Sequence, residues 1–130
     1  MPLVKVQIYK GKSEEYRRAV LDGIHAALVE AIKIPDSDRM QSLIELDPEH
    51  FERSGGRSED MTLVEITMFK GRSIEAKKNL YKAIARNLER SPGIGGKDIL
   101  IVLYESPMED WSLRDGLAAS DTGVGFKVDV

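Results

Sequence analysis

Two stretches of the chain begin with apolar and polar residues that largely alternate, and both continue with a helical spacing. The alternation runs from Leu3 to Tyr9 and from Leu63 to Phe69, as expected for strands with one buried face. Apolar residues then recur every fourth position, which is typical of an amphipathic helix. These positions are Tyr16, Val20, Ile24 and Leu28 in the first stretch and Ala76, Leu80, Ile84 and Leu88 in the second. The pattern predicts two strand-helix units.

Local signals set the limits of both helices. A Lys-Gly pair ends each strand, and Ser13 and Ser73 stand where an N-cap side chain accepts hydrogen bonds from the first helical amides. Pro35 and Pro92 follow the apolar spacing and end the helices, because proline has no amide hydrogen to donate.

A second strand follows each predicted helix. The runs are Met40 to Leu46 and Ile99 to Tyr104. The later run is nearly all apolar, which indicates a strand at the centre of the sheet.

The two units are copies of one another. With a constant offset of 60 residues and no gap, the segment that starts at Pro2 aligns with the segment that starts at Thr62. KGKS aligns with KGRS in register with the aliphatic matches, which indicates a duplication. The identical pairs include Leu3 and Leu63, Val4 and Val64, Lys10 and Lys70, Gly11 and Gly71, Ser13 and Ser73, Ile24 and Ile84, Leu28 and Leu88, Ile34 and Ile94, and Asp38 and Asp98.

The duplication predicts one domain over residues 1–130. Repeat 1 covers about 2–46, the connection 47–61, repeat 2 about 62–104 and a C-terminal tail 105–130, in which the FKVDV run predicts a closing strand. Two β-α-β units make an α+β fold, a four-stranded mixed sheet with both helices on one face. The other face is left bare, so we expect the chain to form an oligomer.

Composition narrows the classes of function. The chain has no cysteine, which excludes disulfides and thiolate chemistry, and its net charge of -3 gives no basic field for nucleic acid or an anionic membrane. No stretch is apolar enough to span a membrane, and the amino terminus lacks the pattern of a signal peptide. We expect a cytoplasmic protein.

A duplicated β-α-β unit with proline directly after the initiator methionine resembles the tautomerase superfamily, in its branch of long, fused subunits that assemble as trimers. Three motifs, IPDSDRMQS, FKGRS and EDWS, look most like malonate semialdehyde decarboxylase and its relatives. The resemblance covers almost the whole chain. It implies a homotrimeric, cofactor-independent enzyme with no metal that acts on a small carboxylate substrate.

The same resemblance implies the roles of individual residues. Pro2 supplies the catalytic secondary amine and Asp38 the catalytic carboxylate. Lys70 and Arg72 form the cationic pair that holds a substrate carboxylate, and Trp111 is an apolar wall. The decarboxylase pattern has arginine at both cationic positions, whereas this chain has lysine at the first. Lysine keeps the charge but cannot make the planar two-point contact of a guanidinium.

The chemistry of a terminal proline fits these roles once Met1 is removed. A free α-amine titrates near about 8, so it can act as an acid or a base close to neutral pH. Arg72 and Lys70 favour the neutral amine, and Asp38 favours the cation. If the first strands of the two copies pair antiparallel about a pseudo-twofold axis, Pro2 lies beside the segment from Phe69 to Arg72.

Structural roles compete with the catalytic ones at several positions. Asp38 lies in a turn-forming PDSD stretch and can cap backbone amides, as can its counterpart Asp98. Arg39 can pair with Asp38 or bind the substrate, and Trp111 can be an anchor of the core or of a subunit interface. Lys10 and Lys12 repeat the cationic pair at positions where we expect solvated side chains.

The two histidines lack the neighbours of a metal site. His25 lies off the apolar helix stripe and His50 lies in the connection, so we expect both on the surface.

The sequence leaves four functions open. The first is a malonate semialdehyde decarboxylase-like enzyme with hydratase activity, the second a keto-enol tautomerase of 2-oxo acids. The third is a non-catalytic, ferredoxin-like module that binds a metabolite carboxylate. The fourth is an oligomeric interaction protein, supported only by the bare face of the sheet.

Overall fold

The computed structural model describes residues 2–130. Its main elements are β1 (Leu3–Tyr9), α1 (Glu14–Ile32), β2 (Gln41–Leu46), β3 (Thr62–Phe69), α2 (Ile74–Arg90) and β4 (Ile99–Ser106). The later part of the chain adds the short strands β5 (Ser112–Arg114) and β6 (Leu117–Ala118) and the short helix α3 (Ala119–Thr122). Three single 3-10 turns are η1 (Pro48–His50), η2 (Gly96–Asp98) and η3 (Met108–Asp110).

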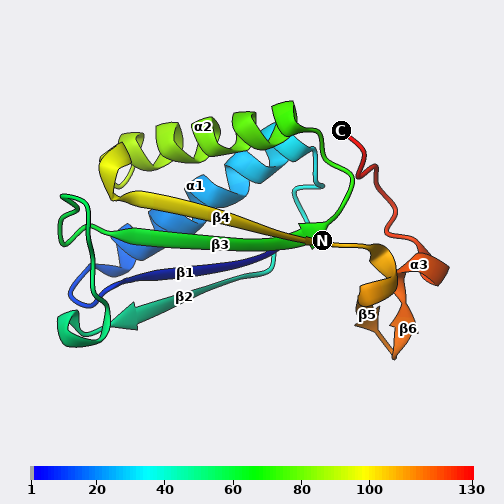
Figure 1. Cartoon of the computed structure of the whole chain (residues 1–130), viewed down its shortest axis with the longest axis horizontal. Helices are drawn as coiled ribbons and strands as arrows, with labels where there is room; N and C mark the ends of the chain where they lie inside the picture. The colour runs from blue at the N-terminus through cyan, green and yellow to red at the C-terminus, as the bar shows by residue number, and fades with distance from the viewer. Residues whose placement is uncertain (1) are drawn as a thin grey trace.

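The four long strands form one mixed sheet in the order β2-β1-β3-β4. The strands of each repeat are parallel, and the two repeats meet where β1 and β3 pair antiparallel. Both long helices lie over the same face of the sheet (Figure 1). The α+β fold predicted from the duplication is therefore confirmed.

The register of the sheet follows the sequence repeat, because two residues 60 positions apart are paired across the two central strands. Lys5 of β1 lies opposite Glu65 of β3, and these residues are equivalent in the two copies. Val4 pairs with Gln41 in the first copy, and the equivalent Val64 pairs with Ile101 in the second. A pseudo-twofold axis thus passes between β1 and β3 at Lys5 and Glu65.

The equivalence continues beyond the second strand of each copy. The turns η1 and η3 are 60 residues apart, and an aromatic residue follows each. The ring of Phe51 packs on Tyr9 with centroids 4.9 Å apart, and the ring of Trp111 packs on Phe69 at 4.7 Å. The copies share structure for at least five residues after β2 and β4.

The core fills the space between the sheet and the helices. Ser13 and Ser73 cap α1 and α2 by accepting from the amides of Tyr16 and Ala76, as the sequence predicts. The two helices then cross closely at Gly23, where a Cβ atom would lie 3.0 Å from the Leu88 side chain. The fully buried side chains at this layer include Val6, Ile24, Leu28, Val64, Ile66, Met68, Leu80, Ile84 and Leu88.

The prediction that the nearly all-apolar second strand of repeat 2 lies at the centre of the sheet is wrong. That strand, β4, lies at an edge. Ile101 and Leu103 pack towards the core, whereas Leu100 and Tyr104 are exposed on the face that carries no helix. Its apolar character on both sides reflects that bare face and not a central position.

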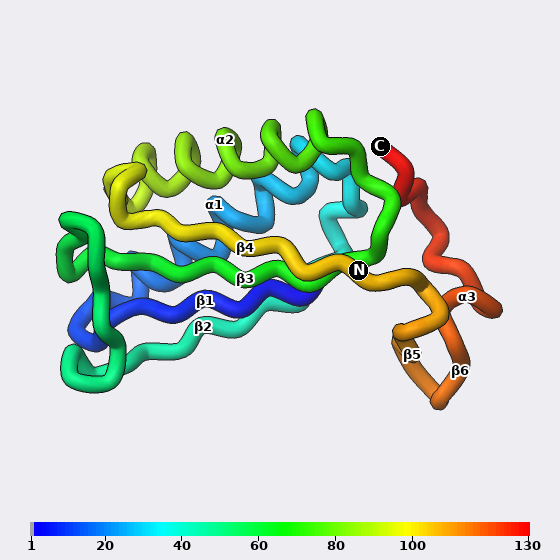
Figure 2. The backbone as a smooth tube through the Cα atoms, in the orientation of Figure 1, coloured from blue at the N-terminus to red at the C-terminus, as the bar shows by residue number. Residues whose placement is uncertain are grey.

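The predicted closing strand at the end of the tail is also wrong. Residues 126–130 form no strand; Phe126 and Val130 pack against the core instead, and the Ser73 amide donates to the Val130 carbonyl at 2.9 Å. The tail bends back past the start of α2, at the end of the sheet where the described chain begins (Figure 2). This placement brings the tail to the candidate site.

Candidate active site

The start of β1 brings Pro2 to the end of β3. Because β1 and β3 are antiparallel, with Leu3 opposite Thr67, Pro2 lies beside the segment that leads to Arg72. The Val4 amide donates to the Met40 carbonyl at 3.1 Å, so the loop between α1 and β2 joins the same corner. Pro2 is buried there.

Arg72 is a buried cation at this corner. The residue is 5% exposed, and Nη1 donates to the Phe69 carbonyl at 3.2 Å. Nε and Nη2 are also buried, and neither has a hydrogen-bond partner in residues 2–130. Burial lowers the pKa of Arg72, while the charges of Glu105 and Asp38 oppose that shift. The guanidinium therefore carries two buried donors that make no hydrogen bond within the described chain.

Glu105 belongs to this electrostatic group although the sequence analysis did not include it. Its carboxylate accepts from Lys77 Nζ at 2.5 Å. The equivalent pair in the first copy, Arg17 and Glu45, is 3.5 Å apart. Opposite charges repeated at an offset of 60 residues were a signal in the sequence that could have identified this pair.

Asp38 and Arg39 lie in the loop between α1 and β2. The Asp38 amide donates to the Pro35 carbonyl at 3.0 Å, which closes a tight turn. Both residues line a hollow of about 410 Å³ together with Val124 and Phe126 of the tail. Arg39 donates to the Asp22 carboxylate of α1 at 2.5 Å, so it forms its ion pair with Asp22 and not with Asp38. Contact between Arg39 and a substrate stays a prediction.

Lys70 and Trp111 flank the end of β3. The Lys70 amide donates to the Ser106 carbonyl at 3.0 Å, and its side chain is exposed. The Trp111 indole donates to the Ser106 hydroxyl at 2.8 Å while its ring meets Phe69 edge-on. These contacts hold Trp111 as a half-buried wall beside the Lys70 backbone.

The tail covers the loop that carries Arg72. Gly71 has φ of +135°, a conformation that glycine adopts without strain, and a Cβ atom there would lie 3.1 Å from the Val128 carbonyl oxygen. The next contact along the chain is the Ser73 amide with Val130. Val128 and Val130 therefore lie against the loop that carries Arg72.

The corner that the pseudo-twofold axis relates to this one has the same backbone framework but different side-chain partners. Asp98, the counterpart of Asp38, is buried and accepts from the Ser58 amide and hydroxyl, both at 2.7 Å. Lys12, the counterpart of Arg72, donates to Asp60 at 2.5 Å. The connection between the repeats thus satisfies both charged positions at this end. Lys12 is not the solvated side chain that we expected, because its side chain is only 21% exposed.

The burial of the Tyr16 hydroxyl shows that the corner formed by Lys12 and Asp98 is closed to solvent. This hydroxyl has no hydrogen-bond partner within the described chain. Burial raises the pKa of Tyr16 to about 12, with added contributions from Asp60 and Asp98. Lys12 Nζ lies 5.0 Å from the centroid of the Tyr16 ring, a favourable cation–π distance.

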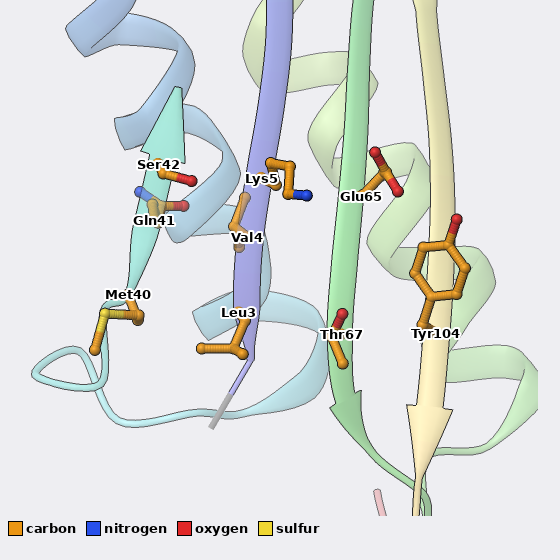
Figure 3. A pocket seen from close by; sticks show the side chains of 9 residues that line it. All are labelled: Leu3, Val4, Lys5, Met40, Gln41, Ser42, Glu65, Thr67 and Tyr104. Carbon is orange, nitrogen blue, oxygen red and sulfur yellow. The ribbon is translucent and has the colours of Figure 1, made fainter. Parts of the chain in front are cut away.

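A separate hollow of about 380 Å³ lies on the bare face of the sheet. Figure 3 shows Lys5 and Glu65 side by side on neighbouring strands, with Leu3 and Met40 at the end of the sheet where β1 begins. Tyr104 lies on the other side of Glu65, and its hydrogen bond to that carboxylate raises the pKa of the phenol. Met40 lines both this hollow and the one beside Asp38.

The prediction of a surface position is wrong for His25. Its side chain is 6% exposed because it faces the loop between α1 and β2, whereas His50 is exposed. Across residues 2–130, no three histidine, aspartate or glutamate side chains gather where they could hold a metal ion. None of the helices formed by these residues has the length and apolarity needed to cross a membrane.

Two family models match the chain. Residues 2–61 match one described as tautomerase enzyme, and residues 38–114 match a second with the same description. The chain is similar to two curated proteins of Bacillus subtilis (strain 168). It is 30% identical to the probable tautomerase YrdN over 95% of this chain and 98% of that one, and 28% identical to the probable tautomerase YusQ over 91% and 97%.

Solved structures show the same similarity. A malonate semialdehyde decarboxylase inhibited by 3-bromopropiolate has a TM-score of 0.88 and 32% identity, over 96% of this chain and 99% of that one. Another malonate semialdehyde decarboxylase, described with decarboxylase and hydratase activities, has a TM-score of 0.86 and 30% identity, over 93% and 97%. A fused 4-OT in a symmetric trimer has a TM-score of 0.83 and 29% identity, over 94% and 99%.

The closed end yields a prediction about stability. Burial alone raises the pKa of Asp98, but the hydrogen bonds from Ser58 and the charges of Lys97 and Arg53 outweigh it, and the pKa is lowered. Ser58→Ala removes the hydroxyl donor and is expected to lower the free energy of unfolding by about 1 to 2 kcal/mol at neutral pH. Urea denaturation measures this loss, and Ser54→Ala, an exposed position in the same connection, is the control.

The pH dependence of that loss follows from the lowered pKa. The charged form of Asp98 stabilises the fold above the ordinary aspartate pKa of about 3.9, and this contribution disappears as the pH falls through the folded-state pKa. The difference between wild type and Ser58→Ala should therefore shrink below pH of about 4. A difference that stays constant down to pH 2 would contradict the assignment.

Proposed function

This chain belongs to the tautomerase family, and from that premise we propose that it uses the amine of Pro2 on small oxo or unsaturated carboxylic acids without a cofactor. The family and its relatives are enzymes of the isomerase or lyase type, which removes the non-catalytic module from the alternatives. Our leading version is malonate semialdehyde decarboxylase-like, with hydratase activity. It is supported by two solved decarboxylases at 30% and 32% identity.

Arg72 is the single observation that carries the choice of a carboxylate substrate. A buried guanidinium whose Nε and Nη2 donors have no partner within residues 2–130 carries a desolvation cost of several kcal/mol. Two oxygens of a carboxylate match the planar spacing of these donors and neutralise the charge. The free α-amine of Pro2, which exists once Met1 is removed, then lies on the same corner.

The decarboxylation would proceed through the protonated amine, which Asp38 favours. The Pro2 ammonium donates to the carbonyl oxygen of a 3-oxo acid, the bond between the α-carbon and the carboxylate breaks, and carbon dioxide leaves. The electron pair of that bond forms an enolate, which the ammonium stabilises. The α-carbon then takes a proton from the Pro2 ammonium, which becomes the neutral amine. Water returns a proton to the amine, and the hydroxide that remains combines with the carbon dioxide as bicarbonate.

A keto-enol tautomerase of 2-oxo acids is the second candidate. The names of the two curated relatives favour it, and so does Lys70, which stands where the decarboxylase pattern has arginine. In this version the neutral amine removes a proton from the carbon next to the carbonyl, and the carbonyl oxygen receives a proton. Arg72 favours the neutral amine, so the balance between Arg72 and Asp38 decides between the two reactions.

We propose that the enzyme is a homotrimer whose subunits cover the bare face of the sheet. The fused 4-OT relative is a symmetric trimer, and the bare face of this chain exposes apolar side chains along three strands. These are Leu3, Ile44, Leu100 and Tyr104, with Met40 at the entry to β2. Exposed apolar side chains gathered on one face are typical of a surface between subunits.

The amine role predicts the effect of Pro2→Ala. The substitution replaces a rigid secondary amine by a freely rotating primary amine, so kcat/KM for a 3-oxo acid and a 2-oxo acid should fall about 100-fold or more. Steady-state kinetics on both acids test this, with intact-mass measurement showing that Met1 is absent from both proteins. Equal rates for the wild type and the variant would rule out the proposed mechanism.

The carboxylate contact predicts the effect of Arg72→Lys. Lysine keeps a positive charge but cannot make two parallel hydrogen bonds, so KM should rise about 10-fold, with the protein still folded. Arg86→Lys is the matched control, because Arg86 pairs with Glu30 on the exposed surface of the helices. If both variants bind the acid as tightly as wild type, Arg72 does not hold the carboxylate.

The proposed trimer predicts a response to charge on the bare face. Leu100→Glu places a carboxylate on the face that we expect to be covered and should convert trimers to monomers in native mass spectrometry. Ile74→Glu is the control, because Ile74 is 72% exposed at the start of α2, away from that face. A wild-type protein that is monomeric at micromolar concentration would refute the trimer.

A further inference from the structure

His25 is a buried polar residue that the reaction scheme above does not use. Its Nε2 lies 2.9 Å from the carbonyl oxygen of Asp36 and 3.3 Å from the Asp36 carboxylate. A carbonyl oxygen can only accept, so Nε2 carries the hydrogen in this contact. Nδ1 is buried and has no hydrogen-bond partner among the residues described. The imidazole thus makes one well-formed hydrogen bond, from α1 to the loop that follows it.

The contact between His25 and the loop lies close to Asp38 in the sequence. Asp36 precedes Asp38 by two residues, and the Asp38 amide closes the turn by donating to Pro35 at 3.0 Å. The Asp36 carbonyl lies within the turn that this bond closes, so the hydrogen bond from His25 ties α1 to the segment that carries Asp38. The carboxylate of Asp36 is 93% exposed and adds little to the tether.

The second copy of the unit forms the same turn without a histidine tether. Its equivalent turn has the same closing bond, from the Asp98 amide to the Gly95 carbonyl at 3.0 Å. The counterparts of His25 and Asp36 are Ala85 and Gly96, which cannot form the side-chain contact. That turn is held through the Asp98 carboxylate, which accepts from Ser58.

The two copies therefore hold one turn in two ways. One is fixed through its aspartate carboxylate and the other through a backbone carbonyl behind the aspartate. We propose that His25 is a positioning residue for the reaction, because its bond to the Asp36 carbonyl holds the turn that presents Asp38 to Pro2 and Arg72. This inference rests on the proposed function, in which Asp38 sets the charge of the amine.

Three variants separate the positioning role from simple packing. His25→Leu keeps an apolar side chain in the buried site but removes the donor, and we expect kcat/KM to fall about 10- to 100-fold through kcat, as for a reacting group displaced by about 1 Å. KM should change little, because Arg72 holds the carboxylate. His25→Gln places an amide donor at a similar reach and should recover most of the activity. Asp36→Ala keeps the backbone carbonyl and should stay within about 2-fold of wild type.

Hydrogen exchange gives a readout that does not depend on activity. The Asp38 amide is bonded to Pro35, so a peptide covering residues 35–40 should exchange faster in His25→Leu than in wild type, with His25→Gln and Asp36→Ala close to wild type. Peptides from the helices α1 and α2 report whether the whole domain has been destabilised. Faster exchange everywhere, or a His25→Gln variant as inactive as His25→Leu, would identify a packing role and overturn the proposal.

Pro2→Ala and Asp38→Asn distinguish this failure from failure of the proposed function. If both lose activity while His25→Leu keeps wild-type kinetics and exchange, His25 is not a positioning residue and the amine mechanism stands. If Pro2→Ala keeps full activity, the amine mechanism itself fails and with it the role of the turn.

Discussion

The antiparallel pairing of β1 and β3 is the contact on which the rest of the structure depends. Lys5 and Glu65 are equivalent residues placed opposite each other, so every other pair across the two strands is symmetric about them. A shift by one residue would turn the apolar face of β1 away from the helices. The same register places the start of each strand beside the end of the other. The register that closes the core therefore also brings Pro2 beside the segment before Arg72.

The pairing creates two equivalent corners, and their chemistry differs because their surroundings differ. Thr62, the counterpart of Pro2, is an internal residue whose nitrogen is an amide, so that corner cannot offer a basic amine. There the connection supplies Asp60 to Lys12 and Ser58 to Asp98, and the charges are satisfied within the chain. At the other corner Arg72 keeps two buried donors without partners in the described chain.

Much of this arrangement could be predicted from the sequence, because it follows from local periodicity and an ungapped repeat. The features that could be predicted in this way are the strands, the N-caps at Ser13 and Ser73, and the antiparallel pairing. The edge position of β4 could not be predicted, because a strand with two apolar faces has the same sequence pattern at the centre of a sheet as at an uncovered edge. The place of His25 was missed because its partner is a backbone carbonyl, which leaves no mark on the sequence.

The Arg72 corner also explains why the tail matters to the chemistry although it is the least regular part of the fold. A guanidinium in water is screened and attracts a carboxylate only weakly, whereas burial strengthens the attraction and lowers the pKa of Arg72. The Val128 backbone packs on Gly71 and the Val130 carbonyl accepts from Ser73, so the irregular tail is one of the groups that exclude water. The sheet therefore sets which groups meet, and the tail helps to set the polarity of the medium in which they interact.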